Sequence, residues 1–356
     1  MGENKNILPE SEMKKKILVT GGTGYIGSHT TVELIEEGFD VVIIDNLYNS
    51  ETEVTDRIFQ ITGIKPGLHV FDICDKENLN SFFEKQHDIA GMIHFAAYKA
   101  VGESVNKPLD YYRNNLVSLI NLLEAMKVYG IPNLVFSSSC TVYGQPEKLP
   151  VSEDAPVQPA VSPYGNTKQI GEEIIRDTAA ANSKINAISL RYFNPIGAHP
   201  TALIGELPRG VPENLVPYIT QTAFGLREEL KVFGNDYDTP DGSCIRDYLH
   251  VVDLAKAHVT AVKRLVENKN KANYEVFNLG TGKGVSVLEA IESFERVTGI
   301  KLKYKIAGRR AGDIEKIWAD PSLANRELGW RTRSTLDESM KTAWDWENYI
   351  RKDKRK

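Results

Sequence analysis

A glycine-rich turn between a short apolar run and an amphipathic run limits the possible folds of this chain more than any other feature. The apolar run is residues 17–20 (ILVT), the turn is Gly21–Gly27 (GGTGYIG), and the amphipathic run is residues 26–37. The G-x-G-x-x-G spacing within the turn is typical of dinucleotide-binding units, whose glycines permit a tight turn, close approach of a pyrophosphate and close helix–strand packing. We therefore predict a strand, a turn and a helix whose N-terminus binds a pyrophosphate.

An acidic residue follows at the distance that such a unit requires. The next apolar run, residues 41–44, leads into Asp45, which lies 18 residues beyond Gly27. A carboxylate at this place accepts hydrogen bonds from the ribose hydroxyls of adenosine and repels a 2′-phosphate. The pattern therefore predicts NAD, rather than NADP, as the cofactor.

Strand and helix patterns alternate through the first half of the chain. The predicted strands are residues 17–20, 41–44, 70–72, 92–95, 134–137 and 185–190, and the predicted helices are residues 26–37, 76–85, 109–129 and 164–180. Continuous apolar strands that alternate with amphipathic helices indicate a parallel sheet that is buried on both faces. We predict an α/β protein with a doubly wound Rossmann sheet.

The second half of the chain has a different texture. Six prolines punctuate residues 195–240, with many glycines around them. Such a segment is typical of a loop-rich unit whose loops contact a ligand. We predict a disordered leader at 1–14, an NAD-binding domain at 15–190 and a smaller α/β substrate domain at 191–356. Part of the latter, near 245–265, is expected to pack back on the first domain.

Composition excludes several classes of protein. The formal net charge is −5, which argues against a general binder of nucleic-acid backbones. Cys74, Cys140 and Cys244 are far apart and lack metal-ligand spacing, so we expect neither disulfides nor a metal site. No apolar run approaches the roughly 18 residues of a membrane span, and no signal peptide is recognisable. We expect a cytoplasmic protein that is not bound to membranes.

The candidate reactive groups lie in the middle of the chain. The predicted strand at 134–137 leads into Ser137-Ser138-Ser139, which places hydroxyls at the carboxyl edge of the sheet. Tyr164 and Lys168 are four residues apart and share one face of a predicted helix. A nearby ammonium and a positively charged nicotinamide stabilise a tyrosinate, which makes a phenol a usable base. We expect Tyr164, Lys168 and Ser139 to be catalytic, with the Ser139 hydroxyl bonded to the reacting hydroxyl.

Together these segments resemble the extended short-chain dehydrogenase/reductase superfamily and, within it, the UDP-glucose 4-epimerase family, from about residue 16 to about residue 346. The matching motifs are Gly21–His29 (GGTGYIGSH), Asp45–Leu47 (DNL), Ala100–Ser104 (AVGES), Ser137–Gly144 (SSSCTVYG), Ser162–Lys168 (SPYGNTK), Arg191–His199 (RYFNPIGAH), Phe233–Tyr237 (FGNDY), Arg246–His250 (RDYLH) and Arg309–Asp313 (RRAGD).

The resemblance implies a reaction and a set of site residues. A UDP-hexose is oxidised at C4 with NAD, the 4-keto sugar turns over, and re-reduction gives the other epimer. The implied cofactor residues are Gly21, Gly24, Tyr25, Ile26, Gly27, Asp45, Asn46, Leu47, Asn49, Ser50, Asp72, Ile73, Phe95, Ala96, Lys99, Asn114, Ser139, Tyr164, Lys168 and Phe193. The implied substrate residues are Lys99, Ser139, Tyr164, Asn194, Asn214, Leu215, Phe233, Arg246, Arg310, Asp313 and Ile317. The resemblance also implies a homodimer with a role in galactose metabolism.

Other reactions on the same scaffold remain alternatives. A UDP-N-acetylhexosamine or UDP-pentose 4-epimerase would use the same Tyr164 and Lys168. Ile317 stands where bacterial relatives often have a tyrosine that narrows the hexose pocket, and it is either such a contact or a core residue. Dehydratases place an Asp-Glu pair after the threonine of the strand-end motif, whereas Thr141 is followed here by Val142-Tyr143. A non-catalytic NAD-sensing protein would typically lack the tyrosine or the lysine.

Overall fold

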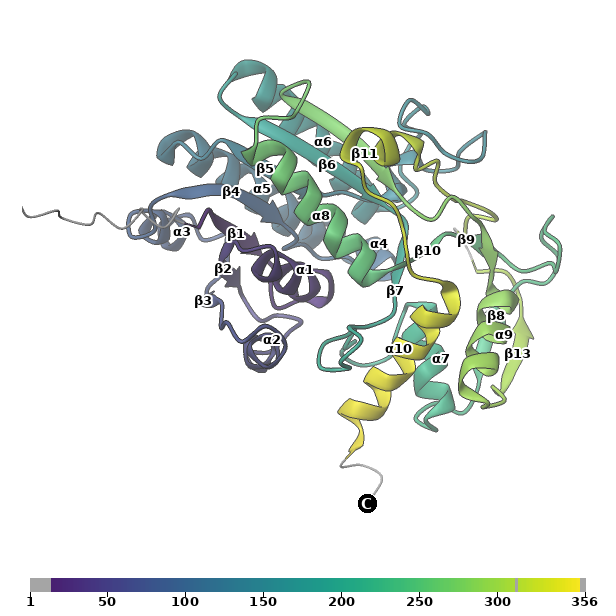
Figure 1. Cartoon of the computed structure of the whole chain (residues 1–356). Helices are drawn as coiled ribbons and strands as arrows, with labels where there is room; N and C mark the ends of the chain where they lie inside the picture. The colour runs from purple at the N-terminus through teal and green to yellow at the C-terminus, as the bar shows by residue number, and fades with distance from the viewer. Residues whose placement is uncertain (1–13, 311–312, 353–356) are drawn as a thin grey trace, which may run out of the picture.

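A seven-stranded parallel sheet forms the centre of the first lobe of the computed structural model, which describes residues 14–310 and 313–352 (Figure 1). Its strands are β1 (Lys16–Thr20), β2 (Asp40–Asp45), β3 (Gly67–Val70), β4 (Ile89–His94), β5 (Asn133–Ser137), β6 (Asn186–Tyr192) and β11 (Tyr274–Leu279). The predicted doubly wound α/β class is confirmed. The leader predicted at 1–14 lies, apart from Lys14, outside the described residues.

The strand order reverses in the middle of this sheet. The order is β11-β6-β5-β4-β1-β2-β3, so the chain runs outward in one direction from β1 and in the other from β4. Ligands of open α/β sheets bind outside the carboxyl ends of the strands at such a reversal. The fold therefore places a binding crevice beside the ends of β1 and β4.

Helices cover both faces of the sheet. On one face, α1 (Tyr25–Glu36), α2 (Glu53–Thr62) and α8 (Val251–Val266) bury aliphatic side chains against the strands. On the other, α3 (Lys76–Phe83), α5 (Pro108–Tyr129) and α6 (Pro163–Ala181) do the same. The short helices α4 (Val101–Asn106) and η1 (Cys140–Tyr143) follow the ends of β4 and β5.

The chain leaves the first lobe after β6 and returns to it later. The returning helix α8 packs on α1, and β11 then pairs in parallel with β6. A buried ion pair joins the two returning elements, because Arg264 Nε and Nη2 donate to the two carboxylate oxygens of Glu275 at 2.7 and 2.8 Å. A strand from the second half of the chain thus completes the sheet of the first lobe.

The second lobe is built from small sheets and three helices (Figure 1). Three two-stranded sheets pair β7 (Asn194–Ile196) with β10 (Tyr248–His250), β9 (Ile245–Arg246) with β12 (Val285–Ser286), and β8 (Leu230–Phe233) with β13 (Tyr304–Ala307). The π-helical turn η2 (Ala324–Leu328) packs on α8 and β11 of the first lobe. The helices of the second lobe, in the described part of the chain, are α7 (Leu215–Ala223), α9 (Val287–Thr298) and α10 (Leu336–Ile350). Ile219, Phe294 and Met340 form part of its separate core.

Local predictions differ from the structure at β3, at β4, which begins at Ile89 rather than at residue 92, and at two helices of the first lobe. The strand predicted at 70–72 lies at Gly67–Val70 instead, because β2 pairs with that segment from Val42 opposite Gly67 to Asp45 opposite Val70. Asp72 consequently follows the strand end, where it can face the crevice. Helices α2 and α4 were not predicted, and α2 buries only Val54, Thr55 and Ile58, which is a narrow apolar stripe.

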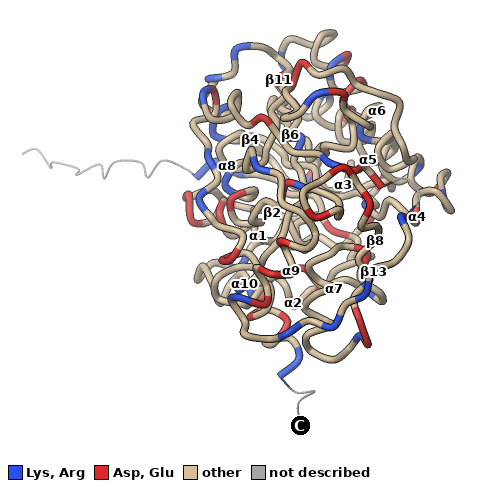
Figure 2. Tube along the Cα trace, turned by 90° about the vertical axis from the view of Figure 1, so that its right-hand side faces the viewer, with Lys and Arg blue, Asp and Glu red and all other residues tan. Residues whose placement is uncertain are grey.

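The described surface carries charges of both signs. Figure 2 shows acidic and basic residues interspersed around α1, α8 and α10, rather than a continuous basic stripe on this side. Within residues 14–310 and 313–352, no helix has the length and apolarity that crossing a membrane requires.

Candidate active site

A cavity of about 1780 Å³ lies between the two lobes, beside the reversal of the strand order. The glycine turn after β1 and the ends of β2, β4 and β5 line one side, and residues 204–218 with Arg246 and Arg310 line the other. Pockets for one small ligand typically measure roughly 300–1,000 Å³. The cavity therefore has the size expected for two nucleotide-sized ligands side by side.

The glycine turn presents bare backbone to this cavity. Gly21 has φ +73°, and a Cβ at this position would lie 2.7 Å from the Ala96 nitrogen. A Cβ at Gly27 would lie 2.1 Å from the Gly21 carbonyl oxygen, so α1 packs too closely on the turn for any side chain. Among the described residues no side chain caps the first turn of α1 at Gly24, which leaves backbone N–H groups available to an anion. These features fit the pyrophosphate of NAD.

Asp45 lies at the end of β2, where the sequence predicts it. Its carboxylate accepts hydrogen bonds from the Thr23 nitrogen at 3.1 Å and from the Leu47 nitrogen at 2.9 Å. The Ser50 hydroxyl also donates to this carboxylate, at 3.3 Å. A carboxylate has about four lone-pair positions, so one position remains for a ribose hydroxyl. Asp45 therefore both fixes the turn and offers an acceptor on the cavity side.

The reactive helix α6 starts at a well-defined cap. Ser162 accepts a hydrogen bond from the Gly165 nitrogen at 3.1 Å, and Pro163 occupies the first turn. Tyr164 and Lys168 are 7% and 4% exposed, and both line the cavity. Lys168 Nζ donates to the Ser137 carbonyl at 2.6 Å and lies 5.9 Å from the centroid of the Tyr164 ring. The helix thus holds both groups against the end of β5.

Burial sets the proton affinities of these groups. It raises the pKa of Tyr164 well above the usual value, with a contribution from Tyr192, although a hydrogen bond with Ser139 lowers it. Burial lowers the pKa of Lys168 to about 8, opposed by the negative charge of Glu172. The expected lowering of the phenol pKa by Lys168 is not found in the chain alone, where desolvation of the phenolate is the largest effect on this pKa.

Two arginines and one aspartate face the cavity from the second lobe. Arg310 Nη2 lies 2.7 Å from Asp313 Oδ1, and Arg246 Nη2 lies 4.0 Å from the same oxygen. The Arg310 guanidinium also lies 5.6 Å from the centroid of the Phe233 ring. Two permanently charged guanidinium groups near one carboxylate suit a diphosphate, which the arginines would bind, with ribose hydroxyls next to the carboxylate.

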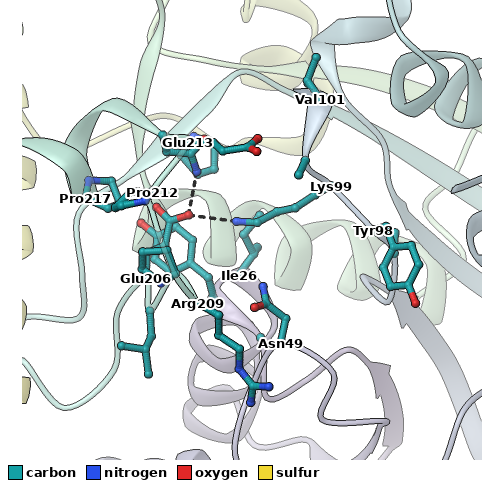
Figure 3. A pocket seen from close by; sticks show the side chains of 18 of the residues that line it. Ile26, Asn49, Tyr98, Lys99, Val101, Glu206, Arg209, Pro212, Glu213 and Pro217 are labelled. Carbon is teal, nitrogen blue, oxygen red and sulfur yellow. Dashed lines mark hydrogen bonds and ion pairs between the residues drawn. The ribbon is translucent and has the colours of Figure 1, made fainter. Parts of the chain in front are cut away.

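Polar contacts that the sequence did not reveal join the two lobes over the cavity (Figure 3). Lys99 Nζ lies 3.0 Å from Glu206 Oε1, which also accepts from Asn214 Nδ2 at 2.7 Å. Arg209 Nη1 and Nη2 donate to the carbonyls of Tyr48 and Ser50 at 2.8 and 2.5 Å. Glu206 and Arg209 stand in a proline-rich loop without a recognisable motif, so no local signal identified them.

Most predicted site residues line the cavity. Those from the first lobe are Gly21, Gly24, Tyr25, Ile26, Gly27, Asp45, Asn46, Asn49, Ser50, Asp72, Ile73, Phe95, Ala96, Lys99, Asn114, Tyr164 and Lys168, and those from the second half of the chain are Asn194, Asn214, Leu215, Phe233, Arg246, Arg310 and Asp313. Four others do not line it: Leu47, Ser139, Phe193 and Ile317.

Three of these four residues have other contacts that account for their positions. Ser139 is 7% exposed, and its hydroxyl accepts from the Thr141 nitrogen at 3.2 Å while it is bonded to Tyr164. Phe193 and Ile317 belong to one core cluster with Val142, so packing accounts for both. Of the two interpretations of Ile317, the structure supports the core residue and not the hexose contact.

Known proteins resemble this chain over nearly its whole length. A family model described as GDP-mannose 4,6 dehydratase matches residues 18–343. The UDP-glucose 4-epimerase of Bos taurus is 50% identical over 341 residues, which is 94% of this chain and 97% of that protein. The chain belongs to the UDP-glucose 4-epimerase family. A UDP-glucose 4-epimerase structure from Stenotrophomonas maltophila, with NAD and formylated UDP-arabinopyranose, superposes with a TM-score of 0.92 at 47% sequence identity. The match covers 95% of this chain and 99% of that chain.

A second structure of the UDP-glucose 4-epimerase family leads to the same conclusion. The Bifidobacterium longum enzyme, in complex with NAD+ and UDP, superposes with a TM-score of 0.89 at 44% identity, and the match covers 94% of this chain and 98% of that chain.

The matching family model is named after a dehydratase, but the residues that follow Thr141 here are Val142 and Tyr143, both fully buried. Neither can act as the acid or base that dehydration requires.

The closeness of α1 to the glycine turn yields a testable consequence. Gly27→Ala should weaken NAD binding by at least tenfold, because the new Cβ must displace the Gly21 carbonyl from 2.1 Å and open the turn. Affinity is measured by calorimetry on protein stripped of nucleotide. Gly308→Ala is the matched control, since a Cβ there meets no atom within 4 Å. Unchanged affinity in Gly27→Ala would contradict the placement of the pyrophosphate.

Proposed function

We propose that this chain interconverts UDP-galactose and UDP-glucose with a bound NAD. The observation that carries the proposal is that one cavity holds a bare glycine turn, a buried tyrosine–lysine pair and two diphosphate-suited arginines. Family membership supports the same activity, as do the NAD-bound relatives described above. The residues that line the cavity are proposed as the NAD and UDP-sugar contacts in the roles that the sequence predicts.

The proposed mechanism divides the work between the lobes. The glycine turn and Asp45 would hold NAD, which when bound would supply a reversible hydride acceptor for C4 of the sugar. Tyr164 takes the proton of the 4-hydroxyl, and Ser139 keeps the phenol oriented through their hydrogen bond. Arg246 and Arg310 hold the diphosphate, so that the sugar turns over while the nucleotide stays bound. The chain thus grips the unreactive end of the substrate and leaves the reactive end free to rotate.

Lys168 supplies a positive charge in a region of low dielectric. Its ammonium stabilises the phenolate of Tyr164 when the proton leaves, because charges interact more strongly away from water. Its second role is to hold the carbonyl of Ser137, to which it donates. The protonated form of Lys168 is therefore the active one.

We also propose that the protein is a cytoplasmic homodimer that pairs through α5. Helix α5 exposes four aliphatic side chains, which is unusual for one helix: Leu109 (73%), Val117 (36%), Ile120 (41%) and Val128 (73%).

The double substitution Val117→Glu and Ile120→Glu should then yield a monomer, as measured by light scattering. A wild-type protein that is monomeric at micromolar concentration would refute the dimer.

Loss of the Tyr164 hydroxyl should slow turnover strongly without loss of folding. We expect Tyr164→Phe to lower kcat on UDP-galactose by about 10²–10⁴-fold, the usual contribution of a general base. Conversion to UDP-glucose is measured without added reductant, with UDP-N-acetylgalactosamine and UDP-xylose in parallel. Tyr304→Phe is the control, because Tyr304 is exposed on β13. A wild-type protein that binds NAD but converts none of these sugars would refute the proposal.

The pKa of Lys168 predicts the alkaline side of the pH profile. Because burial lowers this pKa to about 8, the ammonium is present below pH 8 and is lost as the pH rises through 8. The kcat should therefore decline above about pH 8. It is measured from pH 6 to 10, with the NAD content checked at each pH. A kcat that stays constant to pH 10 would show that the ammonium is not required.

A further inference from the structure

A buried ion pair lies one helical turn beyond Lys168. Glu172 of α6 and Arg191 of β6 are each 7% exposed. Arg191 Nε and Nη2 donate to Glu172 Oε1 and Oε2 at 2.9 and 2.5 Å, which is a bidentate arrangement. Ser138, the residue directly before Ser139, donates its hydroxyl proton to the same carboxylate. The pair is thus attached to the strand end that carries the catalytic serine.

The pair continues into a network that reaches three further elements. Arg191 Nη1 donates to the Tyr143 hydroxyl at 2.9 Å, and that hydroxyl donates to Asn278 Oδ1 at 2.7 Å. The Asn278 nitrogen donates to Glu153 Oε1 at 2.7 Å. Helix α6, β6, the end of β5, η1 and β11 are therefore held together by hydrogen bonds behind the cavity. The mechanism above assigns no role to any charge in this network.

The titratable groups near Lys168 and Tyr164 are mainly ones that are neutral near pH 7. Burial lowers the pKa of His94 on β4 to about 3. Burial raises the pKa values of Tyr192 on β6 and Cys140 in η1 to about 12, and those of Tyr164 on α6 and Tyr111 on α5 also rise. These neighbours contribute no charge at the pH at which Lys168 titrates.

The phenols near the ion pair are of the same kind, whereas Glu153 is a carboxyl group at the far end of the network. Burial raises the pKa values of Tyr143 in η1 and of Tyr274 on β11. Burial also raises the pKa of Glu153, which meets the network at its far end through Asn278. Glu172 is the charge that opposes the effect of burial on Lys168. Glu172 thus favours the charged form of the lysine, while burial disfavours that form more strongly.

We propose that Glu172 is a positioning residue for the epimerase reaction: its carboxylate keeps Lys168 in the ammonium form and ties the serine-bearing strand end to α6, while Arg191 holds the carboxylate in place. This inference rests on the proposed function, because Lys168 matters through the reaction it supports. Glu172 touches neither substrate nor cofactor in this assignment. It acts through Lys168 and Ser138.

The decisive variant is Glu172→Gln, which keeps the shape of the side chain and removes its charge. Arg191 stays charged, since a guanidinium does not lose its proton in proteins. Lys168 then faces an uncompensated positive charge, and the alkaline limb of kcat should move to lower pH by about one unit. KM for UDP-galactose should change less than kcat, because the contacts to the nucleotide are intact.

The matched control is Glu275→Gln. The Arg264–Glu275 pair has similar burial, with side chains 9% and 10% exposed, and similar bidentate geometry, but it joins α8 to β11, whereas Glu172 shares α6 with Lys168. Both variants lose a buried ion pair, so both should unfold at lower temperature. Only Glu172→Gln should move the alkaline limb. A purely structural role for Glu172 would give the two variants the same pH profile.

A second variant keeps the test decisive if Glu172→Gln does not fold. In the double variant Glu172→Leu, Arg191→Leu, apolar side chains replace the whole pair, a change that folded proteins often tolerate. The alkaline limb should again move to lower pH, by less than in Glu172→Gln, because both charges are gone. If the alkaline limb of kcat in the active variants stays within about 0.2 pH units of the wild-type limb, this inference alone is overturned. An inactive wild-type protein would overturn the proposed function and this inference with it.

Discussion

The reversal of strand order between β1 and β4 is the constraint on which the site depends. At this place the backbones of two strand ends come so close that a Cβ on Gly21 would lie 2.7 Å from the nitrogen of Ala96. The same edge carries the end of β5, so the glycine turn and the serine-bearing strand open into one crevice. A parallel sheet covered on both faces thus supplies a rigid wall, and the loops of the second lobe supply the opposite wall.

Burial is what gives the reactive groups their chemistry. Removal of water raises the pKa of Tyr164 and lowers that of Lys168, because both charged forms lose solvation. A phenol of this kind gives up its proton only where positive charge is already in place, so the lysine and the cofactor determine when it acts. Glu172 and Arg191 extend this arrangement one turn further from the cavity. The protonation state of Tyr164 therefore depends on the charge of Lys168, and that of Lys168 on the charge of Glu172.

Local sequence predicts the parts of this molecule that local chemistry determines. The glycine turn, Asp45 and the pair Tyr164 and Lys168 were found because turn geometry and helical spacing are short-range properties. The contacts of Glu206 and Arg209 were not predicted from the sequence, because they join residues more than 100 positions apart. The end of β3 was displaced for a related reason, since pairing with β2 fixes its register. Ile317 shows the same limit, because a core residue and a pocket residue have the same sequence signature.

The central claim is that hydride leaves C4 of the sugar and returns to the same carbon without reaching solvent. It is tested most directly with UDP-galactose that carries deuterium at C4, converted in ordinary water and analysed by mass spectrometry and proton NMR. We predict that UDP-glucose retains the deuterium at C4, since the cavity holds the carrier and the sugar together throughout. Loss of the label to water would show that C4 is epimerised by proton exchange at carbon, and would contradict the hydride mechanism.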